Sequence, residues 1–436
     1  MSAPATLEAS SGQATERPKP LLIRNRDFRL LWTGESISLL GSEISTIALP
    51  SLAVLIFGVG PLGVGTLVAL QWIPYVLLAP VMGVFTDWLR RKPLMQIANV
   101  ARFIILGSLP LAALFGQLTL TQLYLAAVLK GIFDVVFQLA YQAYMSHVVD
   151  RPDMIEGNAN TQVSRSVALV LGRSAGGGLI SAIGAARAIA ADALSYLVAA
   201  VCLFFIRKPE PEPQPAPRGV GAVLADLKSG VRLTFGNRVL RNLTLMATFG
   251  NMAVSLTLAM IIVFAYKNLH LSAGQLGLAL GIGSVPILLG AALSRRVNQR
   301  LGMGRTLVFT HALLGVAFLL LPTAALGGKG WAIIVIVLSQ GIASLTVPIA
   351  NVGIMTIIQK ATPMQAMGRV GGVALPFVWG ANALGPMLGS AIAVTFTTVV
   401  AFLLASAFAF LAVAWILVGS IQLIIDDVPE DLKVVI

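Results

Sequence analysis

Long apolar runs separated by short polar breaks dominate this chain from Phe28 onward. A helix needs about 20 predominantly apolar residues to cross the hydrocarbon core of a bilayer. The pattern predicts twelve such helices, at roughly 30–57, 63–86, 93–115, 119–148, 161–183, 186–206, 240–265, 273–293, 305–326, 330–358, 365–394 and 397–424. We therefore expect an all-α integral membrane protein.

Polar segments divide the predicted helices into two groups of six. Residues 1–27 predict a flexible tail, and they contain no hydrophobic block of the kind found in a signal peptide. The long interruption at 207–239 opens with alternating prolines, which favour an extended chain, and its part at 224–235 predicts a surface helix. The expected organisation is a cytosolic tail at 1–27, an N-terminal six-helix bundle at 28–206, a cytosolic linker at 207–239, a C-terminal six-helix bundle at 240–424 and a cytosolic tail at 425–436.

The composition supports a protein that is dissolved in lipid. Of the 436 residues, 57% are apolar and 11% are charged, whereas soluble globular chains have about 45–50% and about 25%. Too little polar surface remains to cover the fold in water, which excludes an ordinary soluble enzyme. The net charge of +12 would suggest a nucleic-acid partner in a soluble protein, so the placement of the basic residues matters.

Most Lys and Arg residues lie in alternate loops, on the side of the predicted bundle that also holds both termini. Only Arg187, Lys267 and Lys329 lie in loops on the other side. Cytoplasmic loops of membrane proteins are enriched in Lys and Arg. The positive charge therefore predicts that both termini and the linker are cytoplasmic, and it gives no support to nucleic-acid binding.

The two halves repeat part of their pattern. The segment LGRSAGG at 171–177 in the fifth predicted span corresponds to LGPMLGS at 384–390 in the eleventh. Six helices return the chain to the same side of the membrane, so repeats of this kind are parallel. A solute site is expected between the halves near the bilayer midplane, reached alternately from each side.

The run GVFTDWLRRK at 83–92 resembles the G-x-x-x-D-R-x-G-R-R/K signature of the major facilitator superfamily of transporters. It departs from that signature at Trp88 and Arg90, where the family has Arg and Gly. The resemblance implies a cytosolic gate in which an acid at a helix end pairs with a basic turn; the alternative is a charge cluster that only sets topology. The gate residues would be Gly83, Asp87, Arg91 and Lys92.

The glycine-rich fifth span resembles the antiporter motif of exporters in this superfamily, with Arg173 in the place of the usual proline. Small residues let helix backbones approach closely. The packing motif expected in the fifth and eleventh spans comprises Gly172, Gly176, Gly177, Gly385 and Pro386. The segments NRDFRLLW at 25–32 and ADALSY at 191–196 resemble the bacterial branch of macrolide, multidrug and siderophore exporters.

Carboxylates are distributed unequally between the halves, because the sequence contains no acid between Asp226 and Asp426. Ionisable groups inside a membrane usually face the interior of a bundle or a wet cavity. A carboxylate that carries a coupled proton must therefore lie in the first half. The candidates are Glu43, Asp134 and Glu35, and the candidate charge partners are Lys130, Arg102 and Arg173.

The depths of these charges in their spans suggest specific pairs. Glu35 is expected to pair with Arg102, and Arg173 with Glu43 or Asp134, or with an anionic group of a substrate. A basic neighbour favours an ionised carboxylate and an apolar setting favours the protonated form, so movement between the two can load and release a proton. The alternative for each pair is a permanent structural salt bridge.

One face of the fourth span carries Lys130, Asp134, Phe137, Tyr141 and Tyr144, at offsets of 0, 4, 7, 11 and 14 residues. The first two residues have the i,i+4 spacing of a helical ion pair. The aromatic residues are expected to line a cavity for an apolar or cationic solute. The alternative is a packing seam between helices.

Other polar or aromatic side chains are candidates for contact with the solute, although each alone is more often an interhelical hydrogen bond. They are Trp72, Tyr75, Asn251, Gln340, Asn351 and Asn382. His311, the single histidine away from the ends of a predicted span, is expected to be packed rather than catalytic. The sequence has no metal-ligand spacing and no phosphate-binding loop, so we expect neither a metal nor an ATP-driven engine.

The expected function is proton-coupled efflux of a small amphipathic compound, such as a drug or siderophore, by alternating access. The expected location is a bacterial inner membrane, with a monomer that uses the proton gradient and no cofactor. One alternative is an importer or a lysophospholipid transporter or flippase of the same fold. Another is a receptor or assembly protein that carries no flux. An enzyme is the least supported, because no nucleophile–base pair or metal cluster is apparent.

Overall fold

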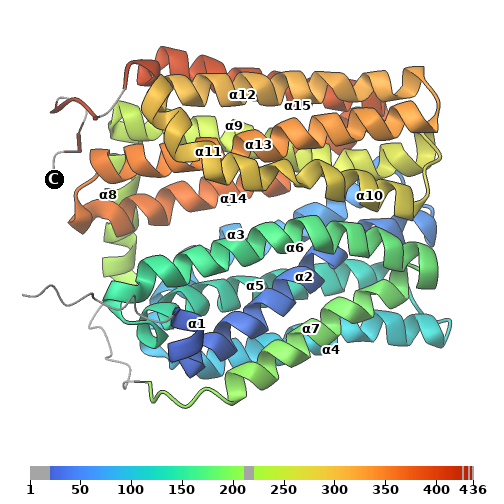
Figure 1. The fold of residues 1–436 in the computed structure, drawn as a ribbon, viewed down its shortest axis with the longest axis horizontal. Coiled ribbons are helices and arrows are strands. Elements are labelled where there is room, and N and C mark those ends of the chain that lie inside the picture. The colour runs from blue at the N-terminus through green and yellow to red at the C-terminus, as the bar shows by residue number, and fades with distance from the viewer. Residues whose placement is uncertain (1–19, 211–219, 425–426, 431–432, 435–436) are drawn as a thin grey trace, which may run out of the picture.

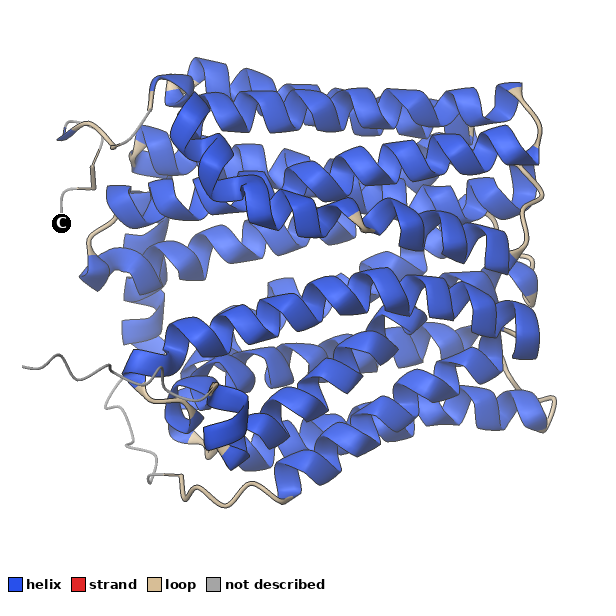
Figure 2. Cartoon of the chain, in the orientation of Figure 1, coloured by secondary structure: helices blue, strands red, loops and turns tan. Residues whose placement is uncertain are grey.

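The computed structural model describes residues 20–210, 220–424, 427–430 and 433–434, without the side chains of 79–88, 220–224, 226–227 and 364–365. All regular elements within these ranges are helical (Figure 2). Twelve helical segments are long and apolar enough to cross a membrane. The predicted all-α, twelve-helix membrane architecture is therefore confirmed.

The first half of the molecule consists of six spans joined by short connections. They are α2 (Arg26–Leu55), α3 (Pro61–Trp88), α4 (Arg91–Leu114), α5 (Leu120–Val148), α6 (Met154–Ile183) and α7 (Ala185–Phe204). A short helix α1 (Leu21–Arg24) precedes α2, and a 3-10 turn η1 (Arg151–Asp153) precedes α6. Helix α2 packs against α6 and α7, and α5 packs against α3 and α4.

The second half also contains six spans, one of which is broken. Its elements are α9 (Arg238–Val263) with the π-helical turn η2 (Phe264–Asn268), α10 (Ala273–Ser284), α11 (Pro286–Leu301), α12 (Met303–Leu320) with η3 (Leu321–Leu326), α13 (Lys329–Ala361), α14 (Met364–Thr395), and α15 (Thr398–Val418) with η4 (Ile421–Leu423). Helices α10 and α11 form a single span, interrupted at Pro286, which has no amide hydrogen to continue the helical ladder. The connecting helix α8 (Val220–Gly236) packs against α14.

The region before α2 is more ordered than the prediction of a flexible tail over residues 1–27. Residues 1–19 lie outside the described part of the chain, but Leu21–Arg24 is helical. Leu21 is buried, and its amide N–H donates to the Glu156 carboxylate at 2.7 Å. The side chain of Asn25 then caps α2 by accepting from the Phe28 N–H at 2.9 Å. A four-residue helix is too short to produce a periodic pattern, so tertiary contacts decide this segment.

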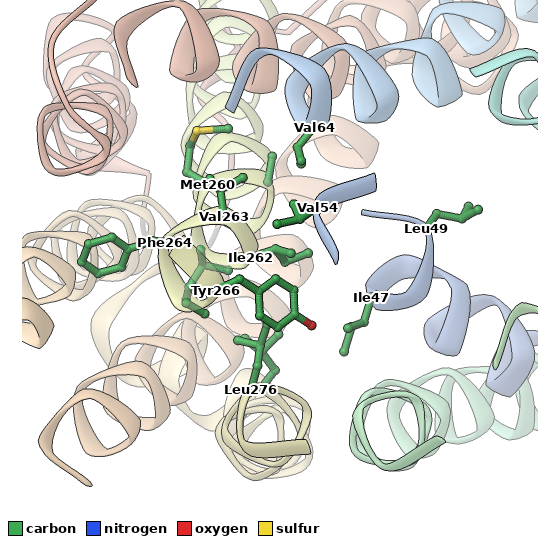
Figure 3. Close-up of a cluster of buried hydrophobic side chains, with 14 of the residues drawn as sticks. Ile47, Leu49, Val54, Val64, Met260, Ile262, Val263, Phe264, Tyr266 and Leu276 are labelled. Carbon is green, nitrogen blue, oxygen red and sulfur yellow. The ribbon is translucent and has the colours of Figure 1, made fainter. Parts of the chain in front are cut away.

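The two halves share one hydrophobic core at only one end of the molecule. We call the end where α2 begins and α15 ends the terminal end, and the opposite end the far end (Figure 1). At the far end, Ile47 and Val54 of the first half belong to the same buried cluster as Val263 and Tyr266 of the second (Figure 3). Toward the terminal end each half has a separate core. The halves are therefore joined at the far end.

Candidate functional site

Close contacts between the halves lie toward the far end. Helix α3 packs against α14, and α6 packs against α10. A hydrogen bond of 2.7 Å joins the hydroxyl groups of Ser51 and Tyr266. At the crossing of α6 and α10, a Cβ placed on Gly177 would lie 2.5 Å from the Cα of Gly277. The absence of side chains at this crossing allows the two backbones to touch.

The other members of the predicted packing motif also lie at helix crossings. Gly172 and Gly176 of α6 face α2, where an added Cβ would come within 2.6 and 3.2 Å of its atoms. Gly385 of α14 lies against α9 in the same way. The carbonyl of Pro386 lies against Gly65 of α3, 2.6 Å from the position of a Cβ on that glycine. The crossings of α6 with α2 and of α14 with α9 each lie within one half, whereas the crossing of α14 with α3 joins the two halves.

A cavity of about 440 Å³ lies in the second half, between α9, α12, α13 and α14. Its lining is mostly aliphatic. The polar side chains in the lining are Thr244, Asn251, Thr310, His311, Thr346 and Asn351. Asn251 and Asn351 were predicted to contact a solute, whereas His311 was expected only to pack. His311 lies about one helical turn from Leu314, which lines the same cavity, but no sequence pattern indicated that this face of α12 borders a space.

The remaining polar candidates lie elsewhere. The rings of Trp72 and Tyr75 of α3 are tilted by 41° with their centroids 5.0 Å apart, and Tyr75 meets Trp379 of α14 edge-on at 5.3 Å. This cluster spans the two halves, and the sequence analysis missed Trp379. Gln340 donates to the Ser344 hydroxyl at 3.3 Å on its own helix. Asn382 is half-buried on α14 and, like the other three, does not line the cavity.

Glu43 and Arg173 form an ion pair between α2 and α6. The guanidinium Nε lies 3.0 Å from the carboxylate Oε2, and the side chains are 25% and 9% exposed. This is one of the two acidic partners that the sequence left open for Arg173. Gly172, the residue before Arg173, brings the backbone of α6 against Glu43. Arg173 therefore lies on α6, the helix that also carries the Gly177 contact with the second half.

Asp134 accepts from two bases at once. Lys130 Nζ lies 2.6 Å from one carboxylate oxygen, as its i,i+4 spacing predicts, and Arg102 Nη1 lies 3.0 Å from the other. A second guanidinium nitrogen of Arg102 donates to the amide oxygen of Asn99. Both cations donate to the same carboxylate, so charge-assisted hydrogen bonds hold the cluster together.

The predicted ion pair between Glu35 and Arg102 is wrong. Arg102 is directed to Asp134 on α5, and Glu35 has no ion pair or hydrogen bond with any residue whose side chain the structure describes. The Glu35 side chain is nevertheless buried, with 7% exposed. The sequence indicated a similar depth for the two groups, but only the packing of α4 on α5 sets the direction of the guanidinium.

The aromatic part of the α5 stripe is buried within the first half. Phe137, Tyr141 and Tyr144 belong to its separate core, and none of them lines the cavity. Phe137 stacks on Tyr141 at 5.8 Å, and the Arg102 guanidinium lies 4.2 Å from the ring centroids of Phe137 and Tyr196. Cations are attracted to aromatic faces at such distances. In this conformation the burial favours the packing interpretation of the stripe.

The predicted gate is described only in part, because Gly83 and Asp87 lie among the residues without described side chains. The backbone N–H groups of Arg91 and Lys92 donate to the Glu210 carboxylate at 2.7 and 3.1 Å. These are the first residues of α4, where unsatisfied N–H groups attract an anion. The sequence analysis missed Glu210, whose only signal was an acid within the Pro-rich linker.

Solved structures with this fold include a mutant of the nucleoside transporter NupG, with a TM-score of 0.75, 12% identity and coverage of 91% of this chain and 100% of that chain. A bacterial homologue of the iron transporter ferroportin in an inward-facing state has a TM-score of 0.73 and 15% identity, over 91% and 98%. Such low identities establish the fold alone.

Two proteins are distantly related in sequence. The uncharacterised MFS-type transporter YfiS of Bacillus subtilis (strain 168) is 23% identical over 215 residues, which span 49% of this chain and half of that protein. The multidrug efflux pump Tap of Mycolicibacterium fortuitum is 23% identical over 331 residues, 74% of this chain and 78% of that protein. The Major Facilitator Superfamily model matches residues 31–386. The chain therefore belongs to the major facilitator superfamily and is a transporter rather than an enzyme.

Proposed function

We propose that this transporter exports a small amphipathic compound in exchange for protons. The observation that carries the proposal is the one-sided joining of the halves, which share a core at the far end and have separate cores toward the terminal end. Two bundles that hold together at one end form one state of an alternating-access cycle. The distant similarity to the efflux pump Tap supports export as the direction.

The charge of the loops supports an orientation for this state. Basic residues gather at the terminal end, and loops rich in Lys and Arg are typically cytoplasmic. In this orientation, both termini lie in the cytoplasm of a bacterial cell and the separated cores face inward. A compound then enters the cavity from the cytoplasm or the inner leaflet.

The cavity suits an amphipathic compound. Its volume of about 440 Å³ is in the usual range for small-molecule sites, about 300–1,000 Å³. Aliphatic side chains from four helices supply most of the surface, and amide, hydroxyl and imidazole groups supply a few polar contacts. Such a lining favours compounds with a large apolar part and few polar groups.

We assign proton coupling to Glu43. Its ion pair with Arg173 joins α2 to α6, and α6 also carries the Gly177 contact with the second half. Protonation of Glu43 removes the negative charge that pairs with Arg173. It therefore loosens the attachment of α6 to α2, and α6 is a helix at which the two halves meet. Asp134 suits this role less well, because loss of its charge leaves two cations unpaired. Glu35 has no ion pair among the described residues through which protonation would move a helix.

The proposed cycle starts from the inward-facing state, with Glu43 ionised and paired. The compound binds, the bundles rock to the outward-facing state, and protonation of Glu43 from outside favours release and return. The proton then leaves to the cytoplasm. One charge moving through 100 mV supplies about 2.3 kcal/mol, which biases a two-state equilibrium by roughly fiftyfold.

Proteoliposomes that contain a pH-sensitive dye provide the test. A transported compound drawn from a panel of amphipathic drugs and siderophores is expected to drive proton movement in the opposite direction. Glu43→Gln is expected to reduce this proton movement at least tenfold, whereas Glu43→Asp retains it. Proton exchange that survives in the Gln variant contradicts the assignment of Glu43. A compound and protons moving in the same direction contradict the antiport.

A further inference from the structure

The cavity of the second half contains a single titratable side chain among its lining residues, the imidazole of His311. The coupling scheme proposed above does not use this group. His311 lies on α12 with only 6% of its surface exposed. A titratable group in an otherwise uncharged cavity strongly affects which compounds can bind there.

The orientation of the ring leaves one nitrogen for a ligand. Nδ1 lies 2.9 Å from the carbonyl oxygen of Leu307, one helical turn earlier. A carbonyl only accepts hydrogen bonds, so Nδ1 must carry a hydrogen and Nε2 is the basic nitrogen of the neutral ring. Nε2 makes no hydrogen bond with any side chain that the structure describes. It lies against Gly250 of α9, where an added Cβ would come to 3.1 Å from it.

The charges on the elements around His311 are all basic and lie toward the ends of those elements. They are Arg238 and Arg241 on α9, Arg295, Arg296 and Arg300 on α11, Arg305 on α12, Lys329 and Lys360 on α13, and Arg369 on α14. No charged residue occurs in α15, which also packs against α12. Acids are absent from the sequence between Asp226 and Asp426. An imidazolium at His311 therefore has no carboxylate partner from these helices.

An organic cation also lacks a partner in this cavity. Burying a charge without a counter-charge is costly, so a cationic compound gains nothing from these walls except contact with aliphatic groups and neutral dipoles. A carboxylate that arrives together with a proton on Nε2 instead forms an ion pair of zero net charge. Asn251 and Asn351 line the same cavity and supply amide N–H donors for an acidic group.

We propose that the second-half cavity selects weakly acidic amphipathic compounds, and that His311 Nε2 binds their carboxylate as its imidazolium. The proposal rests on the proposed function in that this cavity is taken as the site of the transported solute. Binding takes one proton from solution for each carboxylate bound, and the proton is carried on Nε2. The affinity for such a compound therefore falls as the pH rises.

Equilibrium binding to the purified full chain, without a membrane gradient, tests the proposal. The probes are a dansyl-labelled undecanoic acid, its primary amide and the matching alkyl amine. We expect the acid to bind most tightly at pH 6 and to lose about 25- to 100-fold in affinity by pH 8, because the uptake of one proton per bound carboxylate lowers the affinity by up to about tenfold for each pH unit. The affinity for the amide is expected to change less than twofold over this range.

Two variants assign the effect to Nε2. His311→Gln keeps a polar side chain of similar size but does not titrate, so the acid should lose its advantage and bind more weakly than the amide, because a buried carboxylate then has no counter-charge. Gly250→Ala places a methyl group against Nε2 and should weaken acid binding without changing His311. Gly372→Ala is the matched control in the same half, because its added Cβ meets no atom within 4 Å. Thermal unfolding of each variant confirms that it is folded.

The outcomes separate this proposal from that of proton-coupled efflux. A pH-dependent preference for the acid that persists in His311→Gln overturns it, as does tightest binding of the amine. Failure of all three probes to bind the wild-type protein also overturns it. Glu43→Gln, which tests coupling, should keep the pH-dependent preference for the acid over the amide, because Glu43 is not in the cavity. Loss of exchange in that variant thus leaves the His311 result unchanged.

Discussion

Arg173 Nε lies 3.0 Å from Glu43 Oε2, and this ion pair ties α2 to α6 one helical turn from the point where α6 touches the second half at Gly177. A single ion pair in the first half thus lies on the same helix as the contact between the halves, and about one turn from it. The relationship gives the charge state of Glu43 a direct route to the conformation of the transporter.

The first prediction concerns the strength of this pair. Glu43→Gln and Arg173→Gln are each expected to lower the free energy of unfolding by about 1–3 kcal/mol, less than a fully buried pair because Glu43 is 25% exposed. The double variant should lose less than the sum, since neither partner is then left unpaired. Thermal unfolding in detergent measures these changes. Additive losses would show that the two groups do not interact.

Asp134 is expected to be more important for stability than Glu43. Asp134→Asn removes the carboxylate that bonds both Lys130 and Arg102, so two adjacent cations lose their ion-pair partner and we expect a loss of about 3–5 kcal/mol. Adding Lys130→Gln should restore part of this loss, because one unpaired cation is removed. The same unfolding measurement checks both variants. A stability of Asp134→Asn equal to that of Glu43→Gln would contradict the prediction.

The crossing of α6 and α10 should control which end of the transporter is open. Gly177→Ala places a Cβ 2.5 Å from the Cα of Gly277, so the helices must separate and the far end should open. Gly178→Ala is the matched control, since its Cβ meets no atom within 4 Å. Distances between spin labels at loop positions 117 and 328 report the change. Equal distance distributions in the two variants would contradict this prediction.

The hydrogen bond between Ser51 and Tyr266 also holds the far end closed. Tyr266→Phe removes the hydroxyl that lies 2.7 Å from Ser51 and keeps the ring. We expect the closed far end to lose about 0.5–1.5 kcal/mol, which shifts the population by about two- to tenfold. The same spin-label distances measure the shift. Ser42→Ala, which removes a hydroxyl paired with Tyr196 inside the first half, should leave the population unchanged.

Glu210 is expected to stabilise the start of α4. Its carboxylate accepts from the N–H groups of Arg91 and Lys92, so Glu210→Ala leaves both without that partner. We expect the first turn of α4 to lose about 0.5–2 kcal/mol, the usual effect of removing a helix cap. Hydrogen exchange of the amides of Arg91, Lys92 and Leu94 should become faster by about two- to thirtyfold. Unchanged exchange there would show that water replaces the carboxylate without cost.

The hydrophobic pattern was sufficient to predict the spans, because a bilayer requires a long apolar run for each helix. Local spacing was also sufficient for the Lys130–Asp134 pair, since residues four apart on a helix share a face. Depth in the membrane, the basis for pairing Glu35 with Arg102, was not sufficient, because these residues lie on different helices. Depth along a helix follows from the sequence, but the direction of a side chain around the axis depends on which helices pack together.

The position of the cavity was equally beyond the sequence. Asn251, His311 and Asn351 lie on three helices, and no local pattern states that these helices leave a space between them. Glycine positions predicted close packing, but not that Gly177 would meet Gly277 of the other half.

By itself, the sequence determined that the protein lies in a lipid bilayer, how many spans it has, and that the second half contains no carboxylates. Each of these depends only on composition and on order along the chain. Only the tertiary structure decided which acid meets which base, where the halves join and that His311 faces the cavity. The physical reason is that these relationships arise between helices distant in sequence, where packing sets distance and direction together.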